Sequence, residues 1–234
     1  MNNEEVNLTN DAFLLHRVLK TDIKKVPDVE EDEIIFGCGC FWGAEKCFWK
    51  LPGVITTSVG YAGGEKNNPT YYEVCSGLTG HSEVVRVIWD KREIDISDLL
   101  KMFWECHDPT QKNRQGNDMG TQYRSAIYYK NENNIKTILA SKEQYQTELS
   151  KKNLGLIETE IKMIDSYFYA EQYHQQYLAS AGSRQYCSAS PTKVKLGVFT
   201  GSNYKLEDHI WENFNWEVDK CVLRSDNNPI KNNI

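Results

Sequence analysis

The chain has 234 residues, a formal net charge of −6 and an isoelectric point near 5.5. This length suffices to bury one hydrophobic core, and a chain of this size rarely divides into two domains. The acidic balance, with no basic cluster longer than two residues, argues against nucleic acid or another polyanion as a partner. Every apolar stretch is shorter than the ~18 residues of a membrane span, and the acidic, Asn-rich start has the pattern of neither a secretory signal nor a transit peptide. We therefore expect a cytoplasmic monomer that does not bind membranes.

The predicted elements begin after a polar segment, residues 1–30, which contains only a short helical pattern around residues 13–19. From there on, apolar periodicity and turn residues separate alternating strands and helices. In chain order we predict a strand over 33–36, a helix over 41–51, a strand over 54–61, a polar loop to Gly80, a strand over 82–90, a helix over 97–105 capped by Ser97, a long loop, a strand over 122–130, a helix over 132–151, a strand over 157–164 and a helix over 169–180.

The order of these elements is βαβ followed by a second βαβ, which is typical of a split-βαβ plait. We therefore predict an α/β (α+β) fold. Its core is a two-layer plait, with a mixed β-sheet built from two βαβ units and helices packed on it. Beyond Gly182 the periodicity is weak, which predicts a long irregular C-terminal tail that frays over residues 224–234.

Cys40 lies between the first predicted strand and the first predicted helix, in the segment Gly39-Cys40-Phe41-Trp42-Gly43. A thiol at the N-terminal end of a helix is stabilised as thiolate by the helix dipole, which lowers its pKa. Most cysteines are simply small buried hydrophobic residues. The glycine-flanked position at a helix start instead predicts a nucleophile.

Glu83 lies on the strand over 82–90, where alternation places it on the same face as Val85, Val87 and Trp89. If that face is buried, desolvation raises the pKa of the carboxyl group, and Glu83 stays protonated near neutral pH and can serve as an acid. The alternative is a glutamate at a strand end whose carboxylate turns to solvent. His81, just before this strand, is interpreted as a hydrogen-bonding turn residue without a catalytic role.

The seven cysteines, at 38, 40, 47, 75, 106, 187 and 221, are odd in number and irregular in spacing, which predicts thiols rather than a disulfide scaffold. No Cys or His pair has the spacing of zinc ligands, so we expect no metal. Cys187 follows the last predicted helix in a loop, where a thiol can swing toward an oxidised partner. Cys221 lies further along the same irregular segment and can relay a disulfide outward.

Several further strings carry a resemblance to a known family. They include the segment around Cys40, Tyr61-Ala62-Gly63-Gly64, Asn68-Pro69-Thr70-Tyr71, Val74-Cys75-Ser76-Gly77, Thr79-Gly80-His81-Ser82-Glu83, His107-Asp108-Pro109-Thr110, the stretch from Arg114 to Ser125, and Tyr173-His174-Gln175-Gln176-Tyr177-Leu178. Together they resemble peptide methionine sulfoxide reductase, type A, over roughly residues 33–187. The resemblance implies a catalytic domain over 31–187, an extension over 1–30 and a tail over 188–234.

The same resemblance implies the activity, which is reduction of methionine-S-sulfoxide, free or in proteins, without a bound cofactor. Cys40 would attack the sulfoxide sulfur and Glu83 would protonate its oxygen. The other implied roles are oxygen binding by Tyr71 and Tyr123, organisation of the pocket by Asp118, a wall for the substrate methyl made by Phe41 and Trp42, and a pocket edge at Tyr186. From position alone, each tyrosine is more often a packing residue, and Asp118 is more often a turn former.

For recycling, the resemblance assigns Cys187 as the thiol that resolves a Cys40 sulfenic acid, with thioredoxin or another dithiol as the reductant. The tail departs from the commoner family pattern, because Ser188-Ala189-Ser190-Pro191-Thr192 replaces a glycine-rich segment and a longer extension follows. Whether Cys221 acts as a second relay is therefore left open. Cys38 is interpreted as an inert neighbour of the nucleophile.

Two other classes of function remain as alternatives. The first is a thiol hydrolase or transferase in which His81 or His107 activates Cys40. The second is a non-catalytic module that holds methionine or a peptide in a pocket formed by Phe41 and Trp42.

Overall fold

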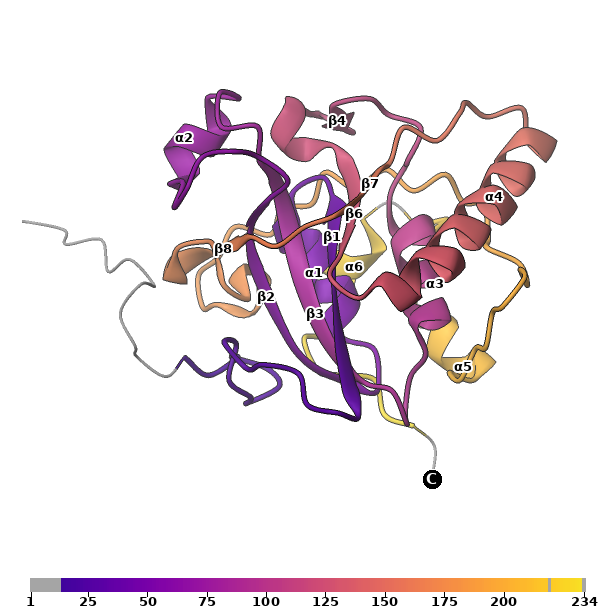
Figure 1. The fold of residues 1–234 in the computed structure, drawn as a ribbon. Helices are drawn as coiled ribbons and strands as arrows, with labels where there is room; N and C mark the ends of the chain where they lie inside the picture. Colours follow the sequence, from indigo (N-terminus) through magenta and orange to yellow (C-terminus); the bar gives the residue numbers. More distant parts are fainter. Residues whose placement is uncertain (1–13, 219, 233–234) are drawn as a thin grey trace, which may run out of the picture.

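The computed structural model describes residues 14–218 and 220–232. Its centre is a six-stranded sheet with the strand order β7–β6–β1–β3–β2–β8, shown in Figure 1. These strands are β1 (Glu31–Cys38), β2 (Val54–Ala62), β3 (Ser82–Asp90), β6 (Ser125–Tyr129), β7 (Glu160–Met163) and β8 (Tyr167–Tyr169). The helices are α1 (Phe41–Trp49), α2 (Tyr71–Cys75), α3 (Ile96–Cys106), α4 (Ile135–Lys151), α5 (Asp208–Trp211) and α6 (Cys221–Arg224).

The sheet confirms the predicted split-βαβ plait. β1 and β2 are each antiparallel to β3, which lies between them, so the first βαβ unit is split by a strand. β3 and β6 are likewise each antiparallel to β1, which splits the second unit. β6 pairs in parallel with β7, which makes the sheet mixed.

The main hydrophobic core lies between the sheet and the helices. Ile34 and Phe36 of β1 belong to this cluster together with Phe48 of α1 and Phe103 of α3, whereas Ile35 belongs to a smaller cluster. This division follows from the alternation of side chains along a strand. The Phe36 ring stacks on both Phe48 and Phe103, at centroid distances of 4.9 and 5.1 Å. α1 and α3 are thereby fixed over one face, and α1 holds Cys40 at its first turn.

The predicted helix over 169–180 is wrong. β8 ends at Tyr169, and two 3₁₀ turns, Gln172–His174 and Tyr177–Ala179, are separated by Gln176 in the left-handed region at φ 47°. Side-chain amides explain this, because Gln175 bonds to both the N–H and the C=O of Val59. Gln176 donates its backbone N–H and its amide to Glu45 of α1. These tertiary hydrogen bonds take the place of helical ones.

Smaller differences concern the ends of elements. Asp95, not Ser97, caps α3, and its carboxylate accepts the Ser97 N–H at 2.9 Å. The strand predicted over 157–164 is shorter, Glu160–Met163. The strand predicted over 122–130 is Ser125–Tyr129, preceded by a 3₁₀ turn over Thr121–Tyr123. The described part of the N-terminal segment forms turns and a bridge between Leu15 and Asp22 instead of a helix, and Phe13 lies outside the described residues.

The C-terminal tail is mostly irregular in secondary structure, as predicted, but its described part, up to residue 232, is packed rather than frayed. Its apolar side chains belong to the main core, among them Val194, Leu196, Phe199, Leu206, Ile210, Phe214 and Val222. Near its end, the carbonyl oxygens of Ser225, Asn227 and Asn228 accept hydrogen bonds from Lys46 and Trp49 of α1 and from its C-cap residue Lys50. In the part of the chain described, no helix has both the length and the apolar character needed to cross a membrane.

Candidate active site

Cys40 is the N-cap residue of α1, between β1 and the helix, as the sequence predicts. Two glycines make this position possible. Gly39 has φ +86°, a conformation that L side chains rarely adopt. A Cβ on Gly43 would lie 2.5 Å from the sulfur of Cys187, so only glycine leaves room for that thiol.

The predicted low pKa of Cys40 is wrong for the free pocket. Burial raises the pKa of this thiol well above its ordinary value, and the nearby Glu83 carboxyl raises it further. The Trp42 backbone N–H lowers it, as expected at a helix start, but this effect is the smaller one. Cys40 is only 9% exposed, so desolvation of the thiolate outweighs the helix dipole. The resting residue is a neutral thiol.

Glu83 is buried as the strand alternation predicts, with 2% of its surface exposed. Its carboxyl accepts a hydrogen bond from the backbone N–H of Phe41 at 3.1 Å. Burial raises the pKa of Glu83 to about 8, and the nearby Asp118 adds to the shift. A protonated carboxylic acid therefore lies beside the residue that follows Cys40.

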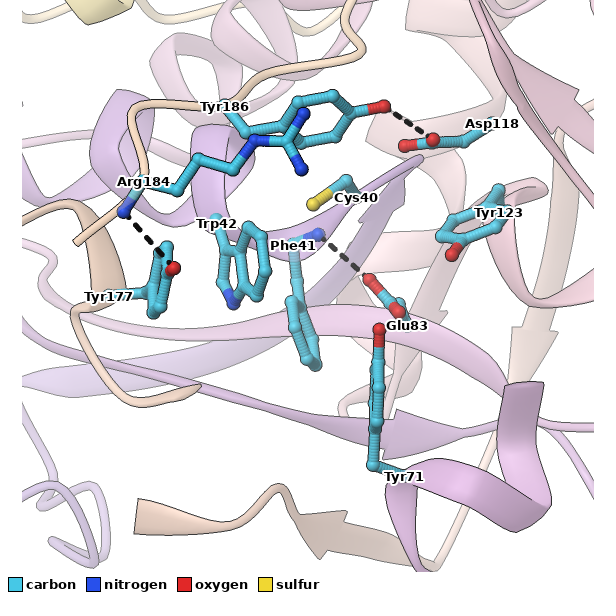
Figure 2. Close-up of a pocket in the computed structure, with 10 residues that line it drawn as sticks. All are labelled: Cys40, Phe41, Trp42, Tyr71, Glu83, Asp118, Tyr123, Tyr177, Arg184 and Tyr186. Atoms are coloured by element: carbon cyan, nitrogen blue, oxygen red, sulfur yellow. Dashed lines mark hydrogen bonds between the residues drawn. The ribbon is translucent and has the colours of Figure 1, made fainter. Parts of the chain in front are cut away.

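These groups line one pocket of about 380 Å³. Figure 2 shows the hydroxyl groups of Tyr71 and Tyr123 directed toward the Glu83 carboxyl. Burial raises the pKa of both phenols, so they remain hydrogen-bond donors. The Tyr186 hydroxyl donates to Asp118 at 2.5 Å across the pocket edge. The ten lining residues are Cys40, Phe41, Trp42, Tyr71, Glu83, Asp118, Tyr123, Tyr177, Arg184 and Tyr186.

Trp42 forms a rigid wall of this pocket. Its ring stacks on Tyr177 at 3.9 Å, and its Nε1 donates to His174 Nδ1 at 3.1 Å. The sequence reasoning missed Tyr177 and Arg184 as lining residues. Tyr177 lies in one of the family-like strings, so a signal for it existed, whereas Arg184 lies in a loop without a motif.

Cys187 lies in an irregular segment, as the sequence predicts, and its thiol is buried. The thiol is 3% exposed, and burial raises its pKa to about 12. Beyond it, the Ser190 N–H donates to the Gln115 side chain, and a Cβ on Gly116 would collide with the Ser188 carbonyl. The chain after Cys187 is therefore held against the loop that carries Asp118.

Cys187 and Cys221 line a common small cavity of about 10 Å³ together with Cys47 and Cys106. Burial raises the pKa of Cys221 to about 12, and the Cys47 and Cys187 thiols act on it in the same direction. The cavity is otherwise lined mainly by apolar and aromatic groups, including Trp216 and Val222. Cys187 thus faces Gly43 of α1 on one side and the tail cysteine on the other.

Cys38, Cys106 and His107 form a cluster that the sequence did not predict, with ligand-type atoms within 4.8 Å of one another. The His107 ring is already satisfied, because Nδ1 pairs with the Phe103 carbonyl and Nε2 with the Ser125 hydroxyl, both at 2.7 Å. Both sulfurs and the ring are buried in the core. These contacts account for the cluster as packing in the core.

The histidines required by a hydrolase lie elsewhere. Among the described residues, no histidine lines the Cys40 pocket. His81 accepts the Gly64 N–H and pairs with the Lys66 carbonyl, which confirms its role as a turn residue. The His174 ring accepts the Trp42 Nε1–H, and burial lowers its pKa to about 4. The site therefore combines a thiol with a carboxylic acid instead of a Cys-His pair.

Comparisons with known proteins agree with this site. A family model described as peptide methionine sulfoxide reductase matches residues 32–204. The chain is 53% identical over 180 residues to peptide methionine sulfoxide reductase MsrA of Vibrio vulnificus, covering 77% of this chain and 86% of that protein. It is 57% identical over 164 residues to the MsrA protein of Azotobacter vinelandii, covering 70% and 76%.

Solved structures give the same result. Methionine sulfoxide reductase A of Corynebacterium diphtheriae matches with a TM-score of 0.67 and 39% identity, covering 85% of this chain and 98% of that one. Mxr1 of Saccharomyces cerevisiae in its reduced form matches with a TM-score of 0.64 and 33% identity, covering 74% and 95%. The chain therefore belongs to the peptide methionine sulfoxide reductase family.

Proposed function

We propose that this enzyme reduces methionine-S-sulfoxide, free or in oxidised proteins, to methionine, with Cys40 as the nucleophile and Glu83 as the acid. The observation that supports these roles is the thiol and the buried, protonated carboxyl in one pocket. A sulfoxide needs both, because its sulfur must be attacked while its oxygen takes up a proton.

In the first step, the sulfur of Cys40 attacks the sulfoxide sulfur and Glu83 donates its proton to the sulfoxide oxygen. The S–O bond then breaks as the oxygen passes to Cys40, which leaves methionine and a Cys40 sulfenic acid. Two electrons move from the cysteine to the substrate, and the thiol proton of Cys40 restores the Glu83 carboxyl. Since both groups rest in their neutral forms, the free pocket avoids two adjacent buried charges.

The other lining residues position the substrate. Tyr71 and Tyr123 donate hydrogen bonds to the sulfoxide oxygen, because their hydroxyls are directed toward Glu83, the residue that protonates it (Figure 2). Phe41 and Trp42 enclose the substrate methyl group, and Tyr186 closes the edge of the pocket through its bond to Asp118. Through this hydrogen bond, Asp118 fixes the position of the Tyr186 ring at the edge of the pocket.

In the second step, the Cys187 thiol attacks the sulfenic sulfur of Cys40, which releases water and forms a Cys40–Cys187 disulfide. The packing of Cys187 on Gly43, within the first turn after Cys40, supports this assignment. Cys221 is proposed as a second relay, because it shares a cavity with Cys187. A dithiol such as thioredoxin then reduces the enzyme's disulfide by thiol–disulfide exchange. This restores the cysteine thiols and leaves the dithiol oxidised.

We place the catalytic apparatus within residues 31–187, with residues 1–30 as an N-terminal extension and 188–234 as a covering tail. A compartment that keeps thiols reduced suits this chemistry, and we propose a monomer acting in protein repair in the cytoplasm during oxidative stress.

The test is thiol counting and peptide mapping after one equivalent of methionine sulfoxide, without reductant. Wild type should lose two thiols and yield a Cys40–Cys187 or, after exchange, a Cys187–Cys221 linkage. Cys187→Ser should still release one methionine per chain and retain a Cys40 sulfenic acid that dimedone traps. Cys221→Ser should accumulate Cys40–Cys187. A persistent sulfenic acid in wild type would refute Cys187 as resolver, and methionine release by Cys40→Ser would refute the nucleophile.

A further inference from the structure

Arg184 is the only positively charged residue among the ten that line the active-site pocket. The two acidic residues of the lining are Asp118 and Glu83, whose raised pKa keeps its carboxyl protonated, and the whole chain carries a net charge of −6. A cation in this position is therefore not explained by the sulfoxide chemistry, since neither the thiol nor the acid requires it.

The residue is held in place by the walls of the pocket. Its backbone N–H donates to the Tyr177 hydroxyl at 3.2 Å, on the ring that stacks against Trp42. Its guanidinium lies over the Tyr186 ring at 5.3 Å from the centroid, in the range of a cation–π contact. Figure 2 shows the side chain extending from the loop to the Tyr186 ring beside the pocket.

The guanidinium itself has no salt bridge, and its N–H groups have no hydrogen-bond acceptor, among residues 14–218 and 220–232. By contrast, Arg86, Arg92 and Arg124 each pair with a carboxylate. An arginine presents a planar set of donors that matches a carboxylate in two-point contact. Arg184 thus offers an unused carboxylate-binding group beside the substrate pocket.

We propose that Arg184 binds a carboxylate of the substrate next to the oxidised side chain, and so selects among methionine sulfoxide substrates by charge. This inference rests on the proposed function of the same pocket. The carboxylate has two possible sources, the α-carboxylate of a free or C-terminal methionine sulfoxide, or the side chain of a flanking Asp or Glu in a peptide.

Two pairs of substrates distinguish these sources. The first pair is N-acetyl-methionine-S-sulfoxide and its N-methylamide, which differ in the α-carboxylate. The second is a pair of end-blocked peptides in which Asp or Asn follows the methionine sulfoxide. For each pair, the measured quantity is the ratio of kcat/KM for the charged over the neutral substrate, at low and at high salt.

In at least one pair, Arg184→Gln should lower this ratio by about 3- to 10-fold, mainly through a higher KM for the charged member. Arg184→Lys, which keeps the charge, should retain most of the preference. Lys151→Gln removes one positive charge from an exposed site on α4 and should leave both ratios as in wild type. High salt should reduce the wild-type ratio toward that of Arg184→Gln.

A fall confined to the first pair identifies the α-carboxylate, and a fall confined to the second identifies a flanking acidic residue. Unchanged ratios in Arg184→Gln for both pairs would overturn the proposal, as would equal losses on charged and neutral substrates. Turnover of the neutral substrates tests the proposed function separately, because a wrong function would abolish activity on every member of both pairs.

Discussion

At the scale of single residues, the active site depends on two buried groups that rest in their neutral forms. Cys40 was predicted to be an activated thiolate, but burial and Glu83 raise its pKa. Glu83 was predicted to be a buried acid, and its pKa is raised to about 8. In the proposed reaction, the protonated Glu83 carboxyl supplies the proton that the sulfoxide oxygen takes up.

Replacing Glu83 with glutamine should remove that proton while keeping the shape of the side chain and its bond to the Phe41 N–H. We expect kcat/KM to fall by about 10²- to 10⁴-fold, the usual contribution of a general acid. Because the wild-type acid has a pKa of about 8, the wild-type rate should fall as the pH rises above 8. The glutamine variant should lack this alkaline fall, and an unchanged rate would exclude Glu83 as the acid.

The same substitution should change how stability depends on pH. The unfolded carboxyl loses its proton near pH 4.5 and the folded one near pH 8, so the folded state holds an extra proton between these values. The contribution of Glu83 is therefore full below about pH 4.5 and is lost as the pH rises to about 8, by linkage. In urea unfolding, Glu83→Gln should gain stability relative to wild type across this interval. A constant difference between pH 4 and 9 would contradict the raised pKa.

At the scale of elements, the contact between α1 and the segment around Cys187 requires a residue without a side chain, Gly43. In Gly43→Ala the new Cβ would lie 2.5 Å from the Cys187 sulfur, so the thiol must move away. We expect slower formation of the Cys40–Cys187 disulfide and a loss of about 1–3 kcal/mol in the free energy of unfolding. Stopped-flow loss of the sulfenic acid and urea unfolding measure the two effects.

Gly155→Ala is the matched control, because its Cβ would have no neighbour closer than 3.5 Å, at Thr110. This variant should resolve the sulfenic acid at the wild-type rate. If Gly43→Ala also does so, the packing of Cys187 on α1 has no part in resolution.

Elements were predicted well where a hydrophobic pattern determines them and poorly where single polar side chains do. The strands β1 and β3 and the helix α1 follow from apolar periodicity, and they place Cys40 and Glu83. The false helix over 169–180 arose because the buried amides of Gln175 and Gln176 bond to distant residues, which no local pattern reveals. Helix α2 was missed although its capping box, Thr70 with Glu73, is visible in the sequence.

The residues of the candidate site also divide into those that a local pattern predicts and those that only tertiary contacts bring together. Tyr71, Tyr123, Asp118 and Tyr186 could be named only by family resemblance, because the separate segments that carry them converge through tertiary contacts. Arg184 has no motif, and its position depends on the Tyr177 hydroxyl and the Tyr186 ring. Its place in the lining therefore required the structure.

At the scale of the whole molecule, the tail is a structural part of the enzyme rather than an appendage. Two lysines at the end of α1 are buried, Lys46 within the helix at 1% and the C-cap residue Lys50 at 4% exposed. Their ammonium groups donate to carbonyl oxygens of residues 225–228, and the Ile230 N–H donates to the Lys50 carbonyl. The C-terminal segment thus supplies hydrogen-bond acceptors to the lysines at the end of the helix that Cys40 caps.

Deleting residues 225–234 should therefore destabilise the protein, although none of residues 225–232, the part of this segment that the structure describes, lines the pocket. Removal of the acceptors leaves two desolvated ammonium groups and the Trp49 Nε1–H without partners, which costs on the order of 2–5 kcal/mol. Urea unfolding measures the loss, and kcat/KM at low temperature should stay near the wild-type value. In the truncated chain, Lys46→Met with Lys50→Met should recover part of the stability, because apolar side chains need no acceptors. Equal urea midpoints for the full and truncated chains, or no recovery with the double substitution, would show that the tail does not satisfy these lysines.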